Sequence, residues 1–227
     1  MASEAHTNLP QLRDPPTYLL SRSIVSLSDP NGGPSEAIRS LRTHIMAKHI
    51  DAGRRALAVC SASSGVGATY VATNLAVALS QIGLKTLLID GNLRNPGVSE
   101  VIRPSVVGPG LYQCLASDED YGSFIDADVV PNLSVMYAGG AAPNPQELLA
   151  QDRFDALMSF CLRDFELTIV DTPPANACSD ARRISTVLGY SMVVARKDTS
   201  RVNDLKTLIS EIQGDGGRVI GTVLNEF

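Results

Sequence analysis

Short apolar runs of strand length alternate with helical patterns through most of this 227-residue chain. Several of these runs are apolar at successive positions, as strands buried on both faces of a parallel sheet are. The alternation predicts an α/β fold, with an open, mostly parallel sheet flanked by helices on both faces. The expected strands are 56–60, 86–90, 133–137, 167–171, 191–195 and 219–224, and the expected helices lie near 68–82, 110–117, 145–163, 179–188 and 200–213.

The first 33 residues differ from the rest of the chain. Four prolines and an Asn-Gly-Gly-Pro turn argue against regular structure and predict a flexible N-terminal tail over 1–33. From Ser35, as N-cap, a helix is expected, with an apolar stripe of Ile38, Leu41 and Ile45. The sequence therefore predicts one folded domain over 34–227.

Composition argues against several classes of protein. A net charge of −5 without a run of Lys or Arg is a poor match for nucleic-acid phosphates. No run approaches the roughly 18 apolar residues that span a bilayer, and the N-terminus lacks the pattern of a secretory signal. The four cysteines have no CxxC spacing, and the three histidines form no metal motif. We therefore expect a cytoplasmic protein with no nucleic-acid partner.

The loop after the first expected strand carries the clearest chemical signal. It reads Ser61-Ala-Ser-Ser-Gly-Val-Gly-Ala-Thr-Tyr70 and leads into a long helix. Glycines in such a loop let backbone N–H groups face an anion, and the helix dipole favours negative charge there. Against G-x-x-x-x-G-K-[ST], Gly67 and Thr69 fit, but Ala68 replaces the lysine. The pattern fits a phosphate site and fits equally a glycine-rich turn that only packs well.

The missing lysine weakens the predicted site. A lysine there makes charge-assisted contacts to the outer phosphates, each worth about 1.5–3 kcal/mol. It also neutralises charge that develops during phosphoryl transfer. We therefore expect any nucleotide to bind weakly.

Two further strands end in an aspartate, Asp90 and Asp171. Ligands of open α/β sheets bind beyond the carboxyl ends of the strands, where both carboxylates would lie. A carboxylate near a phosphate loop can hold Mg²⁺ directly or through water. A lone aspartate after a strand more commonly caps a turn, but two of them beside the loop favour a metal site.

Taken together, these segments resemble the bacterial tyrosine kinase (BY-kinase) family. Its members are cytoplasmic P-loop proteins that work with membrane polysaccharide co-polymerases in capsule and exopolysaccharide export. The resemblance runs from about Ser35 to Phe227, and MinD/ParA-type ATPases are wider relatives that share the loop and the strand-end aspartates. Its most specific parts are EAIRSLRT at 36–43, the loop and helix SASSGVGATYVATNLA, LLIDGNLRNP at 87–96, NPQELL at 144–149, DTPPANACSDA at 171–181 and GTVLN at 221–225.

The resemblance implies roles for individual residues. Thr69, Asp90 and Asp171 would hold Mg²⁺, and the two aspartates would be the catalytic residues. Asn225 stands where relatives place a base-contacting asparagine, although it could also cap a strand end. The nucleotide-binding set for ATP or ADP would be Gly65, Val66, Gly67, Ala68, Thr69, Tyr70 and Asn225.

Glu36, Arg39 and Arg42 match the E-x-x-R-x-x-R motif by which the family's subunits assemble into rings. On a helix the three residues lie within about a third of the circumference, so one neighbouring subunit could contact all of them. The alternative is a solvated helix face with a Glu–Arg pair worth about 0.2–0.5 kcal/mol. The role of Arg182 and Arg183 stays open between partner contact and helix capping.

Three departures from the family point the same way. Ala68 replaces the loop lysine, and Asn92 replaces the second acid of the D-x-D motif. The tyrosine-rich C-terminal tail is missing, since the last tyrosine is Tyr190. Phosphoryl transfer depends on positioning and charge neutralisation, so losing two charged groups should cost several kcal/mol of transition-state stabilisation.

The first hypothesis is therefore a pseudokinase that is inactive or weakly active. It would be a regulatory and assembly partner in the synthesis and export of an exopolysaccharide of the capsule or adhesin type. It would dock on a transmembrane polysaccharide co-polymerase at the inner or plasma membrane and self-associate, in a ring. ATP or ADP with Mg²⁺ would bind weakly or not at all. The second hypothesis is an active tyrosine autokinase, with Arg94 or a neighbouring subunit's cation in place of the lysine. The third is a MinD/ParA-like ATPase, disfavoured because the chain ends at GTVLNEF rather than in a basic amphipathic helix.

Overall fold

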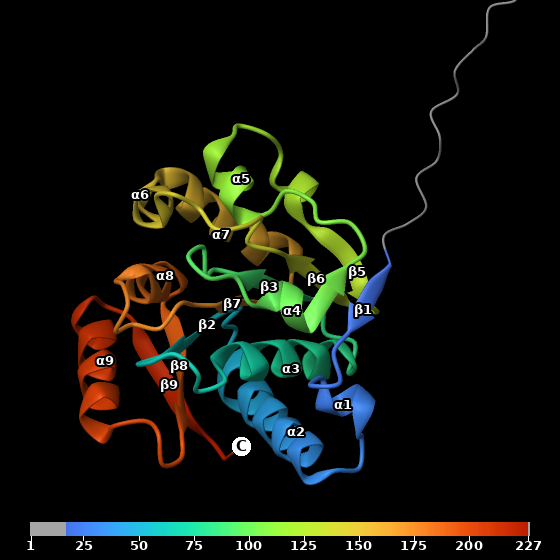
Figure 1. Cartoon of the computed structure of the whole chain (residues 1–227), viewed down its shortest axis with the longest axis vertical. Coiled ribbons are helices and arrows are strands. Elements are labelled where there is room, and N and C mark those ends of the chain that lie inside the picture. Colours follow the sequence, from blue (N-terminus) through green and yellow to red (C-terminus); the bar gives the residue numbers. More distant parts are fainter. Residues whose placement is uncertain (1–16, 227) are drawn as a thin grey trace, which may run out of the picture.

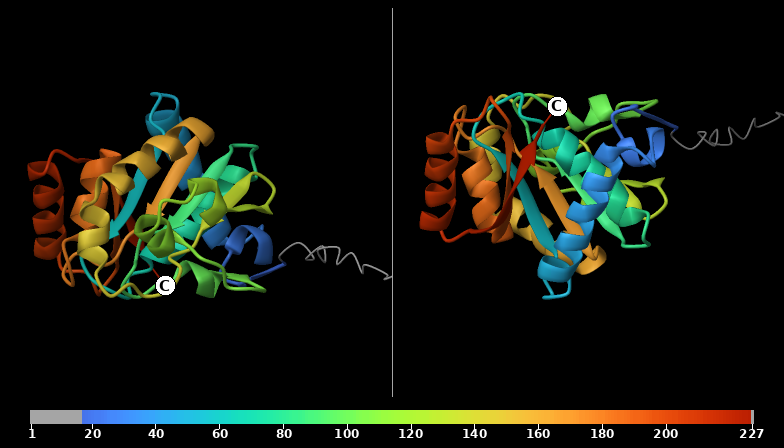
Figure 2. Two further views of the ribbon diagram at one scale, coloured as in Figure 1. Left: turned by 90° about the horizontal axis from the view of Figure 1, so that it is seen from above. Right: turned by 90° about the horizontal axis from the view of Figure 1, so that it is seen from below.

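A seven-stranded sheet lies at the centre of the computed structural model, which describes residues 17–226 (Figure 1). The strand order is β5-β6-β3-β7-β2-β8-β9, and every neighbouring pair is parallel except β5 with β6. Helices lie on both sides of the strands, as the two views of Figure 2 show. The predicted α/β class with an open, mostly parallel sheet is therefore confirmed.

All six expected strands are present. They are β2 (Ala56–Ser61), β3 (Thr86–Asp90), β6 (Leu133–Met136), β7 (Leu167–Asp171), β8 (Tyr190–Arg196) and β9 (Arg218–Asn225). The edge strand β5 (Asp126–Val130) was not predicted. Its pattern is polar and half-exposed, and its register is interrupted near Asp128, which has a positive φ of 49°.

The helices agree with the expected segments apart from their ends and one break. They are α2 (Gly33–Ile45), α3 (Ala68–Ser80), α5 (Leu111–Ala116), α6 (Pro145–Ala150), α7 (Asp152–Asp164), α8 (Asp180–Leu188) and α9 (Val202–Gly214). The expected helix 145–163 is two helices, because Gln151 adopts extended backbone angles between them. Ser35 is not the N-cap of α2, which begins two residues earlier with Pro34 in its first turn. Among residues 17–226, no helix combines the length and the apolar character needed to cross a membrane.

Each face of the sheet carries its own apolar cluster. One cluster joins the sheet to α5 through α9, with Phe154 and Leu115 among its buried side chains. The other joins it to α2 and α3, and every residue of α3 from Val71 to Ser80 is buried. Because α3 is enclosed by the protein, the loop that precedes it is attached to a rigid support.

The prediction of an irregular tail was wrong for residues 17–33, while residues 1–16 lie outside the described part of the chain. Strand β1 (Tyr18–Leu20) pairs antiparallel with β4 (Ile102–Pro104), which follows the short helix α4 (Val98–Val101). A second short helix, α1 (Val25–Ser28), follows β1. Ile24 is fully buried, and the Asn74 side chain accepts a hydrogen bond from the Val25 N–H and donates one to the Ser23 carbonyl. These long-range contacts overcome the local effect of the prolines. The division of the chain into domains stays a prediction.

A buried histidine lies where β2 and β8 begin. His49 belongs to a π-helical turn, η1 (Met46–Ile50), and its Nε2 is 2.9 Å from the Ala56 carbonyl oxygen. Its ring meets the edge of Tyr190 at 5.2 Å between centroids, and the Arg54 guanidinium lies over the same tyrosine. Burial, together with the charge of Arg54, lowers the pKa of His49 below its usual value. The remaining short helical element is the 3-10 turn η2 (Tyr121–Phe124).

The lowered pKa of His49 predicts a loss of stability in mild acid. The unfolded chain takes up the histidine proton more readily than the folded one, so folding stability is lost as pH falls below about 6.5. His49→Gln, which keeps a donor for the Ala56 carbonyl but does not titrate, should flatten this part of the profile. Urea unfolding between pH 7.5 and 5.5 tests the difference between wild type and variant. The exposed His44→Gln is the matched control, and an equal flattening by both substitutions would contradict the assignment.

Candidate functional site

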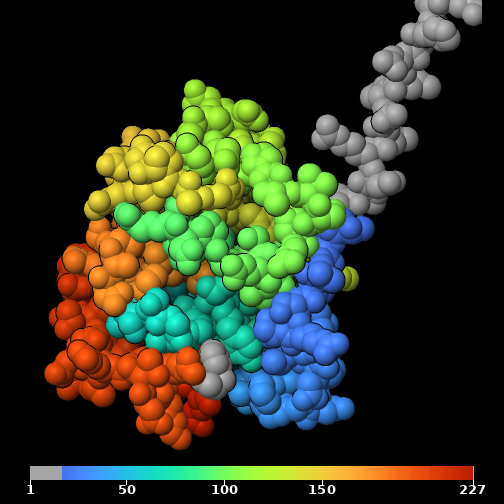
Figure 3. Space-filling view, in the orientation of Figure 1, coloured from blue at the N-terminus to red at the C-terminus, as the bar shows by residue number. Residues whose placement is uncertain are grey.

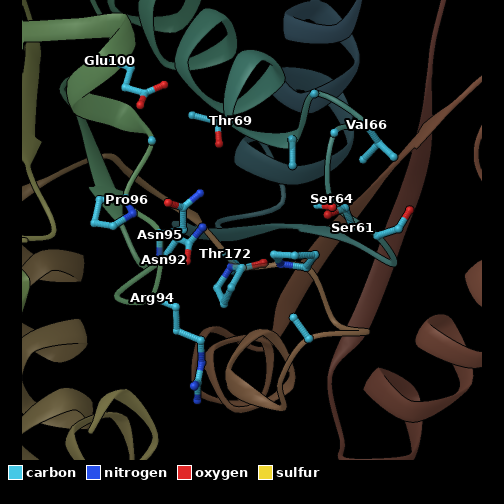
Figure 4. A pocket seen from close by; sticks show the side chains of 18 of the residues that line it. Ser61, Ser64, Val66, Thr69, Asn92, Arg94, Asn95, Pro96, Glu100 and Thr172 are labelled. Carbon is cyan, nitrogen blue, oxygen red and sulfur yellow. Dashed lines mark hydrogen bonds between the residues drawn. The ribbon is translucent and has the colours of Figure 1, made fainter. Parts of the chain in front are cut away.

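A cavity of about 490 Å³ opens at the carboxyl ends of the parallel strands. Three segments line it: the loop 61–69 between β2 and α3, the turn 92–101 after β3, and residues 172–177 after β7. Figure 4 shows these segments facing one another across the cavity. In the space-filling view of Figure 3, the loop segment in cyan reaches the surface between green and orange-red segments. The sheet therefore brings together loops that are distant in the sequence.

The loop has the backbone geometry of an anion site. Gly65 and Gly67 have φ angles of 74° and 87°, in the left-handed region that favours glycine. Immediately afterwards the 13-residue α3 begins at Ala68, so its free N–H groups and its dipole point toward the cavity. The residues expected to bind phosphate thus lie in one loop and one helical turn.

The cavity has lost the cation that the loop motif would supply. Ala68 lines the cavity with a methyl group at the lysine position. Arg94, the hypothetical replacement, forms a two-pronged ion pair with Asp180, whose side chain is almost fully buried. Figure 4 shows the Arg94 side chain directed away from Thr69 and Val66. In this structure Arg94 therefore does not stand in for the lysine.

Asp171 is fully buried beside the loop. Its Oδ2 accepts a hydrogen bond of 2.6 Å from the Thr69 hydroxyl, and its Oδ1 is buried without a hydrogen-bond partner. Burial raises the pKa of Asp171 well above its usual value, and the nearby Asp90 raises it further. An unpaired buried carboxylate oxygen next to a hydroxyl fits a hard cation such as Mg²⁺.

Asp90 is used differently. Its Oδ2 accepts hydrogen bonds from the N–H groups of Gly97 and Val98, both at 2.9 Å, and its Oδ1 accepts one from Asn92 at 3.1 Å. These bonds fasten the turn after β3 and the start of α4. Burial raises the pKa of Asp90, although the three backbone bonds oppose that shift. The structure thus shows the capping role that the sequence left as the alternative.

The described residues contain no cluster of three or more His, Cys, Asp or Glu side chains suited to a metal ion. Magnesium commonly keeps only one or two protein carboxylates and completes its shell with water and phosphate oxygens. The pair Thr69 and Asp171 therefore fits a cation that arrives with a phosphate ligand.

Two charged residues near the loop were not predicted from the sequence. Glu100 on α4 is the one acidic side chain among the residues that line the cavity. Arg196 ends β8, and its Nη1 donates a hydrogen bond of 3.2 Å to the Gly65 carbonyl. Glu100 has no motif to mark it, whereas a basic residue at the end of a central strand could have been noted for Arg196.

A second cavity, of about 440 Å³, involves two further residues expected at the nucleotide site. Tyr70 and Asn225 line it together with apolar side chains of α2 and β9, including Ile38 and Leu41. Asn225 also donates a hydrogen bond of 3.1 Å from Nδ2 to the Val66 carbonyl. Both expected residues therefore lie beside the loop, and Asn225 contacts it directly.

The expected assembly residues lie on α2 and make contacts within the chain. Arg39 binds Glu36 through two nitrogens at 2.7 and 2.9 Å, and both side chains are partly exposed. Arg42 donates to the Ala78 carbonyl near the end of α3, which ties the two helices together. Glu36 and Arg39 therefore form an exposed charged surface, whereas Arg42 has a packing role.

Arg182 and Arg183 link helices. Arg182 pairs with Asp215 at the end of α9, and Arg183 pairs with Asp155 on α7. Both arginines therefore make ion pairs between helices of this chain, a role that the sequence did not predict.

The two strand-end aspartates should respond in opposite ways to amidation. Above about pH 8, where Asp171 is ionised despite its raised pKa, Asp171→Asn removes a poorly paired buried charge and is expected to raise the free energy of unfolding. Asp90→Asn puts an amide donor against backbone donors, so it is expected to lower it by about 1–3 kcal/mol. Urea unfolding without nucleotide measures both variants. Equal destabilisation by the two substitutions would contradict the different roles assigned to these carboxylates.

Comparison with known proteins places this geometry in context. Residues 57–227 match the family described as CobQ/CobB/MinD/ParA nucleotide binding domain. The putative tyrosine-protein kinase CapB of Staphylococcus aureus is 30% identical over 198 residues, which cover 87% of this chain and 86% of CapB. The tyrosine-protein kinase wzc of Salmonella typhi is 31% identical over 90% of this chain, but the chain spans only 28% of its length. The crystal structure of the chimerical protein CapA2B2 superposes with a TM-score of 0.83, at 30% identity and 90% coverage of both chains.

Proposed function

Because the chain belongs to the bacterial tyrosine kinase (BY-kinase) group of the CobQ/CobB/MinD/ParA nucleotide-binding family, we propose that it is a degenerate member. In this proposal the protein is a pseudokinase that binds nucleotide weakly. It is a regulatory and assembly partner in exopolysaccharide synthesis and export. One observation carries the proposal. The anion-binding loop keeps its backbone geometry, while the position that should supply its cation is Ala68.

Retained nucleotide binding is supported by groups that line the cavity or lie beside it. Backbone N–H groups of the loop and the N-terminus of α3 would bind a diphosphate. Thr69 and the unpaired Oδ1 of Asp171 would hold its Mg²⁺, which when bound supplies neutralising charge to the phosphates. Tyr70 and Asn225 line the second cavity beside the loop, and the nucleoside part would lie there. ATP or ADP with Mg²⁺ is therefore the proposed ligand.

Loss of phosphoryl transfer is supported by the same geometry. Asn92 lines the cavity where the family has a second acid, and Arg94 is bound to Asp180. Five of the chain's six tyrosines are half-buried and Tyr137 is buried, so none is offered as a fully exposed acceptor within the described residues. A cavity that lacks the loop lysine and a second metal-binding acid is poorly equipped to move a phosphoryl group.

The assembly role rests on the exposed Glu36–Arg39 pair of α2 and on the family resemblance. In this proposal the chain self-associates through that surface, as a ring, and binds the cytoplasmic side of a transmembrane polysaccharide co-polymerase. It would accordingly be cytoplasmic and peripheral to the membrane. The match to CapA2B2 over 90% of both chains supports the family membership on which this part of the proposal rests.

An active autokinase is the second candidate, and one observation favours it. Glu100 gives the cavity a carboxylate that the motif comparison does not count. In that case a neighbouring subunit would have to provide the missing cation.

Restoring the lysine tests the nucleotide proposal. Wild type is expected to bind Mg-ADP weakly, and Ala68→Lys to bind about 10- to 100-fold more tightly, because a charge-assisted contact is worth about 1.5–3 kcal/mol. Calorimetric titration measures both constants. Ser210→Lys, which adds the same charge on the exposed side of α9, is the control.

Mass spectrometry after incubation with ATP tests the pseudokinase proposal on the same samples. Wild type is expected to show no phosphotyrosine. Strong phosphorylation that Asp171→Ala abolishes would instead establish the autokinase. Absence of binding by both wild type and Ala68→Lys would remove nucleotide from the proposed function.

A charge swap tests self-association. Glu36→Arg combined with Arg39→Glu keeps an ion pair within α2 but presents reversed charges to a neighbour. Sedimentation velocity is expected to show assemblies for wild type and mostly monomers for the swap, with little change in the urea midpoint. Lys197→Glu combined with Glu226→Lys swaps an exposed pair outside α2 and should leave assembly unchanged. A wild type that is monomeric at every concentration would refute this part of the proposal.

A further inference from the structure

Two neighbouring strands end in side chains that hold the phosphate loop by its carbonyl groups. Arg196 at the end of β8 and Asn225 at the end of β9 are partners in the strand register. Arg196 donates to the carbonyl of Gly65 at 3.2 Å, and Asn225 donates to the carbonyl of Val66 at 3.1 Å. Two consecutive peptide units of the loop are therefore bound by two adjacent side chains.

The geometry of the peptide bond makes these contacts relevant to ligand binding. In a trans peptide unit the C=O and N–H groups point in opposite directions, and the described chain contains no cis peptide. The unit with the Gly65 carbonyl carries the N–H of Val66, and the unit with the Val66 carbonyl carries the N–H of Gly67. Holding the two carbonyls fixes where the two N–H groups point.

Those two N–H groups are available to a ligand. Within residues 17–226, neither the Val66 N–H nor the Gly67 N–H donates a hydrogen bond to the protein. Gly65, Val66 and Gly67 all line the 490 Å³ cavity at the carboxyl ends of the strands. The carbonyls are thus bound by the strand ends, while the opposite ends of the same peptide units are left for an anion.

We propose that Arg196 and Asn225 are positioning residues, which orient two peptide units of the loop so that their N–H groups bind a diphosphate. This inference rests on the proposed nucleotide function and extends it to residues outside the loop motif. The glycines at positive φ make the loop intrinsically mobile, so fixing it in advance reduces the entropy lost on binding. This pre-ordering of the loop is important here because Ala68 contributes no charge. The affinity then depends more on the backbone N–H donors.

The inference gives Asn225 a different role from contact with the base, and inorganic pyrophosphate separates the two. Pyrophosphate has the diphosphate but no nucleoside. If Asn225 orients the loop, Asn225→Ala should lower the affinities for pyrophosphate and for ADP by the same factor. The factor expected for one hydrogen bond is about 2- to 10-fold. If Asn225 contacts the base, only ADP should be affected.

The variants are measured by calorimetry with each ligand in the presence of Mg²⁺. Arg196→Ala and Asn225→Ala are expected to weaken the binding of both ligands. Asn225→Asp, which loses the donor and adds a negative charge, should weaken it at least as much as Asn225→Ala. Arg196→Lys keeps a donor and should recover part of the Arg196→Ala loss. Lys197→Ala is the matched control, because it removes the same charge one residue away, from a side chain that faces Glu226.

Two outcomes would overturn the inference residue by residue. Loss of ADP affinity alone in Asn225→Ala assigns that side chain to the base. An Arg196→Ala effect no larger than that of Lys197→Ala means that Arg196 acts through net charge alone.

A measurement without ligand keeps the test independent of the proposed function. Nitrogen-15 relaxation reports the order parameters of the Val66 and Gly67 amides, which should be near the rigid value of about 0.85 in wild type and fall in Arg196→Ala and Asn225→Ala. Lys197→Ala should leave them unchanged. If wild type binds neither ligand, the proposed function fails, but unchanged order parameters in the two variants would be needed to overturn the loop-positioning role.

Discussion

The parallel pairing of β3 with β7 sets Asp90 directly beside Asp171 at the carboxyl edge of the sheet. Both carboxylates are buried, and burial raises the pKa of each. Two like charges enclosed side by side oppose folding unless each finds donors. Asp90 finds three backbone N–H groups, while Asp171 has the Thr69 hydroxyl and one oxygen without a partner. The sheet therefore uses one carboxylate for structure and leaves the other with an unpaired oxygen, which the proposed function assigns to a cation.

Phosphate binding and phosphoryl transfer, which the loop motif normally combines, have different requirements at this site. Binding of a phosphate group depends on backbone donors and on the N-terminus of α3, which the buried helix holds in place. Transfer of a phosphoryl group depends in addition on charges placed around it. Ala68 and Asn92 remove charges without disturbing the glycines or the helix, so the chain can lose transfer while it keeps the shape of the site.

The sequence predicted the parts of the fold that depend on local pattern. The central strands are apolar on both faces, and the loop has its own glycine spacing, so both could be placed from residues alone. The edge strand β5 and the pairing of β1 with β4 lack such a pattern. The order of residues 17–33 depends on Ile24 and Asn74, and Asn74 lies some fifty residues later in the chain. The capping role of Asp90 likewise depends on N–H groups that only the folded turn brings to it.

The loop also shows why a motif comparison gives an incomplete account of such a site. The motif includes the glycines, the lysine and the hydroxyl, all of which lie in the loop or in the first turn of α3. The carbonyl side of the loop is held by Arg196 and Asn225, from strands more than a hundred residues away in sequence. When the lysine is absent, binding relies on how well the backbone donors are oriented, and that orientation depends on the far strands. Under the loop-positioning proposal, the affinity of a degenerate member of this family is therefore set by strand ends that the motif does not include.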